Sequence, residues 1–67
     1  MTGNANYTIT GLDTTMEWAT TNDQNTVWTK VTDPNQQFTG YQSVYVRIAE
    51  VLGVSPESYA TLVTFGG

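Results

Sequence analysis

The sequence contains neither cysteine nor histidine. Without cysteine, the chain has no disulfide, no thiolate metal site and no thiol nucleophile. Without histidine, it lacks the side chain that most often acts as a general acid or base near neutral pH. The remaining acids are six scattered carboxylates, those of Asp13, Glu17, Asp23, Asp33, Glu50 and Glu57. We therefore interpret the protein as non-catalytic, and we expect no cofactor and no bound metal.

Two polar stretches carry, in their side chains, the oxygen atoms that calcium prefers as ligands. These are Asn22–Asn25 and Asp33–Asn35. Neither stretch has the regular spacing of acidic and amide residues that marks a calcium-binding loop. Short polar side chains of this kind commonly bond their own backbone in turns, and we interpret both stretches as turns.

Cations are also scarce, since Lys30 and Arg47 are the only two and the net charge is −4. This matters because "VRIAEVLGVSPESYATLV", residues 46–63, resembles a DNA-binding helix-turn-helix in its local pattern. Gly53 stands where a helix would end, and Ser55 and Pro56 stand where a second would begin. Duplex binding, however, depends on Lys and Arg that neutralise phosphates. We therefore expect no nucleic-acid partner, and the helix-turn-helix remains a remote alternative.

Long apolar runs are absent, so we expect no insertion into a membrane. The start "MTGNANY" lacks the basic and apolar regions of a signal peptide. A chain of 67 residues buries only about 60% of its unfolded surface, which indicates one marginal domain. We interpret residues 1–67 as a single module cut from a longer multidomain protein.

What the sequence does contain is typical of β-strands, because Thr, Val, Ile, Trp and Tyr recur between short polar turns. The regular spacing predicts an antiparallel sandwich or barrel. The segment Glu50–Ser58 is predicted to be a long loop, in which a short helical turn at Pro56–Tyr59 stays open. The predicted strands are Tyr7–Thr10, Thr15–Ala19, Thr26–Val31, Ser43–Ala49 and Tyr59–Phe65.

Side-chain alternation assigns the faces of these strands. Glu17 and Arg47 are predicted to face outward, each between inward neighbours. In "TVWTKV" the alternation is ambiguous, and a β-bulge is one resolution. Trp28 is predicted to fill the centre of the core, and Phe38 to close one end. The other predicted core residues are Ile9, Leu12, Met16, Trp18, Val44, Val46, Ile48, Val63 and Phe65.

Aromatic rings invite a carbohydrate-binding hypothesis, because flat rings with polar edges stack on apolar faces. The alternation assigns Trp18 and Trp28 to the core. Tyr41 and Tyr45 are therefore the candidate ligand-binding residues. The other apolar residues are predicted to lie inside. Few apolar side chains are then left to form a contiguous exposed patch.

The order of motifs along nearly the whole chain resembles a family of small immunoglobulin-like repeats in bacterial surface and secreted proteins. The motifs are "ITGLDTTMEWAT", Trp28, "FTG" at 38–40, "VYVRIAE" at 44–50 and "SYATLVTF" at 58–65. Such repeats occur beside S-layer homology segments or secreted enzymes, often as domains of unknown function. The usual Asp-Gly turn is replaced here by "TTNDQN".

This resemblance implies a small antiparallel immunoglobulin-like β-sandwich of about five to seven short strands. It implies an extracellular or cell-surface location and a structural spacer or interaction module whose partners are neighbouring domains of the same polypeptide. The alternative is an accessory module that binds carbohydrate or cell-wall glycan through Tyr41, Tyr45 or a tryptophan. In the family pattern Met-Glu and Val-Arg recur together, so Glu17 and Arg47 are predicted to form a surface pair.

Overall fold

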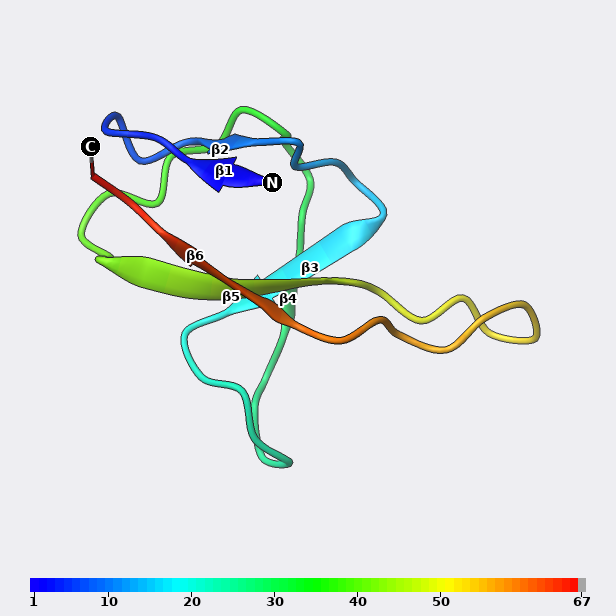
Figure 1. Ribbon diagram of the computed structural model, residues 1–67. Helices are drawn as coiled ribbons and strands as arrows, with labels where there is room; N and C mark the ends of the chain where they lie inside the picture. The colour runs from blue at the N-terminus through cyan, green and yellow to red at the C-terminus, as the bar shows by residue number, and fades with distance from the viewer. Residues whose placement is uncertain (67) are drawn as a thin grey trace.

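The computed structural model describes residues 1–66, which form an all-β fold without any helix (Figure 1). The prediction of an all-β protein is thus confirmed, and the residues described contain no helix that could cross a membrane. The six strands are β1 (Thr2–Gly3), β2 (Ile9–Thr10), β3 (Met16–Ala19), β4 (Thr29–Lys30), β5 (Ser43–Ile48) and β6 (Thr61–Thr64).

The strands form two antiparallel sheets. The larger sheet has four strands in the order β4-β3-β5-β6, and β1 pairs with β2 in a separate ribbon. The ribbon lies above one face of the larger sheet (Figure 1). Of the predicted strands, the second and fourth match β3 and β5 closely, whereas the other three are shorter than expected. Strand β1 was not predicted, because its two residues, Thr2 and Gly3, carry no apolar alternation.

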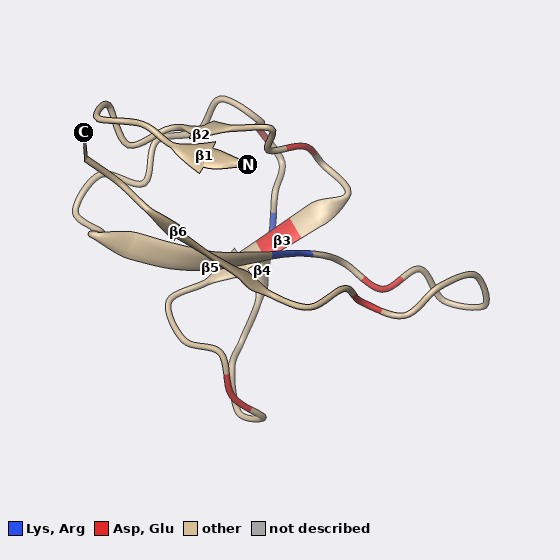
Figure 2. Cartoon of the chain, in the orientation of Figure 1, with Lys and Arg blue, Asp and Glu red and all other residues tan. Residues whose placement is uncertain are grey.

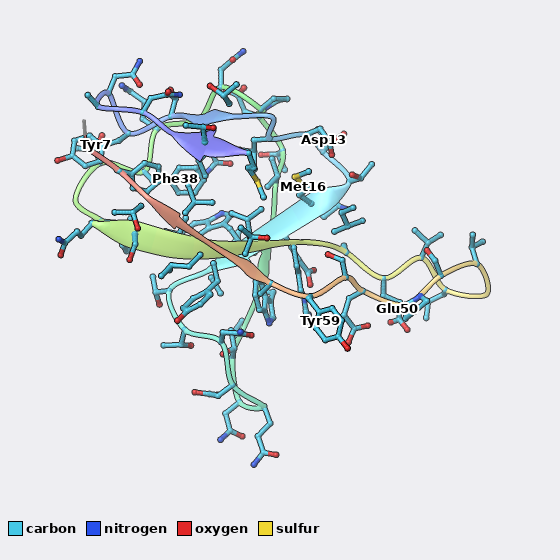
Figure 3. All side chains as sticks on the ribbon, in the orientation of Figure 1. Tyr7, Asp13, Met16, Phe38, Glu50 and Tyr59 are labelled. Carbon is cyan, nitrogen blue, oxygen red and sulfur yellow. The ribbon has the colours of Figure 1, made fainter. Side chains whose placement is uncertain are left out.

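The hydrophobic core lies between the ribbon and the larger sheet. Phe38, which is only 2% exposed, enters from the connection between β4 and β5 and is labelled in the space between the two sheets (Figure 3). Its ring stacks on Phe65 at 5.6 Å between centroids and packs edge-to-face with Trp18 at 5.0 Å between centroids. The core cluster consists of Ile9, Leu12, Val31, Phe38, Val44, Val46, Val63 and Phe65, with Met16 and Trp18 packed against it.

Two predicted core residues lie elsewhere. Trp28 is half-buried and outside the core cluster, because β4 pairs Lys30 with Glu17 and thereby turns Trp28 to the same outward side. The backbone N–H of Val31 then donates to the carbonyl of Met16 in the same register, so Val31 takes the inward place without a bulge. Ile48 lies at the end of β5 and is 46% exposed.

Three aspartates begin turns in the same way. The side chains of Asp13, Asp23 and Asp33 each accept a hydrogen bond from the backbone N–H two residues on, at 2.9, 2.8 and 2.9 Å. The hydroxyl of Thr15 also donates to Asp13 and holds the pKa of that carboxyl below its usual value. These carboxylates therefore serve the local turns, and no three acidic groups gather at metal-binding distance within residues 1–66.

Residues 49–60, here called the arm, extend β5 and β6 away from the body of the molecule (Figure 1). Near the tip, Val51 and Ser55 form a β-bridge around a turn in which Gly53 has φ 78°. Closer to the sheet, the N–H of Ser58 donates to the carbonyl of Ile48 at 3.0 Å. The helical periodicity of this segment is therefore misleading, and neither the helical turn at 56–59 nor the helix-turn-helix is present.

Candidate functional site

The side of the larger sheet that faces away from the core, here called the outer face, gathers charged and aromatic side chains. Strand register decides its membership, because residues directly opposite in a sheet share a face. Glu17 lies opposite both Lys30 and Arg47, and Tyr45 lies opposite both Ala19 and Leu62. The larger side chains of this face are Glu17, Trp28, Lys30, Tyr45, Arg47 and Leu62.

The structure brings Glu17 and Arg47 together on this face, as neighbours in the β3–β5 register. The Nε atom of Arg47 lies 2.5 Å from Oε2 of Glu17, and the two side chains are 23% and 17% exposed. This pair joins residues that are 30 positions apart in the sequence. It links the two central strands and neutralises one of the two cations of the chain.

Trp28 lies beside this ion pair. The guanidinium carbon of Arg47 lies 4.0 Å from the centre of the Trp28 ring, a geometry in which the cation is attracted to the ring's negative face. This contact was not predicted from the sequence, because Trp28 was expected in the core. The available signal was that Trp28 and Lys30 share a face in the alternation. Glu17, Arg47 and Trp28 thus form one cluster on the outer face.

We expect Arg47→Lys to destabilise the protein by about 1 kcal/mol, although it preserves the charge. An ammonium group cannot lie over the Trp28 ring as a guanidinium does while also bonding Glu17. Urea denaturation followed by circular dichroism measures the loss. Lys30→Arg is the control, because Lys30 is exposed and such surface changes stay within about 0.5 kcal/mol. Equal stability of Arg47→Lys and the wild type would contradict the assigned contact.

An open depression lies beside Arg47. Its lining comes from Asn22 in the loop between β3 and β4, from Arg47, and from residues 56–60 of the arm. Tyr59 is 99% exposed at its edge, and Figure 3 shows its ring pointing away from the arm. The depression thus offers an amide, a guanidinium, a carboxylate and an exposed aromatic ring.

The two tyrosines predicted to bind a ligand do not lie together. Tyr41 places its ring against Trp18 at 5.7 Å, and Trp18 belongs to the core side of β3. Tyr45 lies opposite Ala19 on the outer face. Because the two rings contact opposite sides of the sheet, they cannot form one flat platform for a sugar. The exposed ring that sequence reasoning missed is Tyr59.

The arm exposes more apolar surface than its sequence predicts. At its tip Leu52 and Val54 are 85% and 81% exposed, and Val51 beside them is 49% exposed. Glu50 and Glu57 flank the tip, and Figure 2 shows these acidic positions on the arm with the nearest basic residue at its base. The expectation of little exposed apolar surface is therefore wrong. The reason is that the arm extends beyond the core, so its apolar residues have nothing to pack against.

In comparisons with known proteins, no protein family, no curated protein and no solved structure matches the chain.

Proposed function

We propose that this chain is a non-catalytic interaction module of a bacterial cell-surface or secreted protein, and that it makes contacts through its arm and outer face. The observation that carries the proposal is the exposed apolar tip of the arm at Val51, Leu52 and Val54. Exposed apolar residues that are grouped on a projecting segment and rimmed by polar ones are typical of interaction sites. The surface and secreted context, and the finer assignment as an immunoglobulin-like sandwich, rest on the motif resemblance.

The positions of the two chain ends favour an interaction module over a linear spacer. Gly3 packs so closely against the backbone of Thr64 that an added Cβ would lie 2.2 Å from the Thr64 carbonyl oxygen. In Figure 1 the chain leaves β6 on the side of the molecule far from the arm tip, and the N-terminus lies beside β1 above the body of the molecule. Neighbouring domains joined to these ends would leave the arm pointing outward, whereas a linear spacer takes its neighbours at opposite ends.

The test compares the isolated module with the same module inside its longer parent polypeptide, by amide chemical shifts in NMR. If the arm contacts a neighbouring domain, the shifts of Val51, Leu52 and Val54 change on inclusion in the parent, and Leu52→Lys abolishes those changes. Val27→Lys is the matched control, since Val27 is 87% exposed but lies outside the arm. Changes confined to Thr2, Gly3 and Phe65 would support a passive spacer instead.

A second candidate function is glycan binding, which the exposed ring of Tyr59 beside the depression favours. An aromatic ring supplies the stacking surface for a sugar, and the Asn22 amide and Glu57 carboxylate supply hydrogen-bonding groups. We expect titration with cell-wall fragments and common polysaccharides to give saturable shifts at Tyr59 and a change in Trp28 fluorescence. Tyr59→Ala should abolish saturable binding without unfolding the protein. Leu52→Ala should leave binding intact. Shifts centred on Tyr41, or none at all, would contradict this assignment.

A further inference from the structure

One edge of the larger sheet is unprotected. The order β4-β3-β5-β6 leaves β4 and β6 as the two edges. Natural proteins guard sheet edges with very short strands, charges or prolines. Strand β4 has two residues, one of which is Lys30, and Pro34 follows soon after. Strand β6, with the sequence Thr-Leu-Val-Thr, has twice that length and none of these features.

The free backbone groups of β6 can be identified from its register. The N–H of Phe65 donates to the carbonyl of Gln42 at 2.9 Å, on the side of β5. Because backbone groups alternate in direction along a strand, Val63 and Thr61 also point toward β5. Leu62 therefore points its N–H and C=O away from the sheet, as does Thr64, and Ala60, just before β6, bonds no other backbone group. Gly3 covers the Thr64 carbonyl, which leaves the stretch from Ala60 to Leu62 as the open edge.

We propose that β6 pairs with β6 of a second copy of this chain, antiparallel and about a two-fold axis, so that the two larger sheets become continuous. A two-fold interface uses the same patch on both copies, and an antiparallel strand is complementary to itself in this way. With the axis near Thr61, Ala60 of one copy lies opposite Leu62 of the other. The Leu62 side chain, now 52% exposed, would be partly covered.

Charge supports a second copy as the occupant despite the net charge of −4. Residues 58–65 contain no charged side chain, so the pairing edges bring no like charges into contact. Repulsion between the two acidic bodies acts only at longer range, where salt screens it. The interface is small, which predicts a weak dimer that strengthens as ionic strength rises.

Sedimentation over a concentration series into the millimolar range, at low and high salt, measures the dimer. We expect Leu62→Lys to weaken association by about a hundredfold, because it places two like charges on either side of the two-fold axis, one residue from it. Leu52→Lys makes the same chemical change at the exposed arm tip and should leave association intact. Because a substitution in β6 can also disturb folding, circular dichroism of each variant is compared with the wild type.

Amide hydrogen exchange supplies a second measurement that needs no substitution. In the monomer the Leu62 amide has no partner, whereas in the proposed dimer it bonds across the two-fold axis and becomes protected as concentration rises. The Val63 amide, which faces β5 in both states, is the internal reference. A protein that stays monomeric throughout, a dimer with an unprotected Leu62 amide, or a dimer lost in Leu52→Lys but kept in Leu62→Lys would each overturn the proposal.

Discussion

Replacing Phe38 with alanine is expected to remove a large part of the protein's free energy of unfolding at room temperature. Phe38 is 2% exposed and contacts the rings of both Trp18 and Phe65, and its backbone N–H donates to the carbonyl of Tyr7 at 2.8 Å. Truncating a buried phenylalanine costs about 3–5 kcal/mol. A domain of this length has a total stability of about 3–10 kcal/mol, so the loss removes much of it.

Near-ultraviolet circular dichroism and urea denaturation measure this effect. Phe38→Leu keeps most of the side-chain volume and should cost less than about 1.5 kcal/mol. Trp28→Ala is the informative comparison, because it removes a larger side chain from outside the core cluster and should cost about 1 kcal/mol. If Trp28→Ala were less stable than Phe38→Ala, the core would lie on the Trp28 side of the sheet instead.

Gly3→Ala is expected to destabilise the protein by about 1–3 kcal/mol, the usual cost of overpacking. The added Cβ would lie 2.2 Å from the carbonyl oxygen of Thr64 and 3.0 Å from Cγ1 of Val63. The near atom is backbone, so β1 has to move away from β6 to relieve the contact. This movement would loosen the ribbon that covers the core beside Ile9.

The urea midpoint of Gly3→Ala, compared with that of Thr2→Ala, tests this packing. Thr2 is exposed in the same two-residue strand, and its replacement should change the stability by no more than about 0.5 kcal/mol. Amide hydrogen exchange at Ile9 should become faster in the glycine variant alone. A Gly3→Ala protein as stable as the Thr2→Ala protein would show that β1 does not pack against β6.

Several features of the fold could be predicted from the sequence because they depend on residues close together in the chain. The alternation around Glu17 and around Arg47 placed both side chains on the outward face, and the structure has them there. Of the predicted core residues, Ile9, Leu12, Phe38, Val44, Val46, Val63 and Phe65 are buried. The turn at Asp33 is likewise a local hydrogen bond between a side chain and its own backbone.

The candidate site was harder to predict, because its parts meet only when distant strands pair. In "TVWTKV" the local pattern allows either Trp28 or Val31 to face the core, and only the register of β4 on β3 decides between them. That choice brings Trp28 to Arg47. The separation of Tyr41 from Tyr45 follows from the same cause, since one packs on Trp18 and the other follows the outer face of β5.

The arm shows most clearly which features local sequence determines and which depend on tertiary structure. By itself the sequence determined an all-β chain with its central strands, their inner and outer faces, and turns begun by aspartate, because alternation and turn chemistry act between near neighbours. Over residues 46–63 the local pattern also favoured two helices, which are marginal at this length without tertiary packing. Only the tertiary structure decided otherwise, because β5 and β6 pair across the sheet and their ladder holds the connecting chain extended between them.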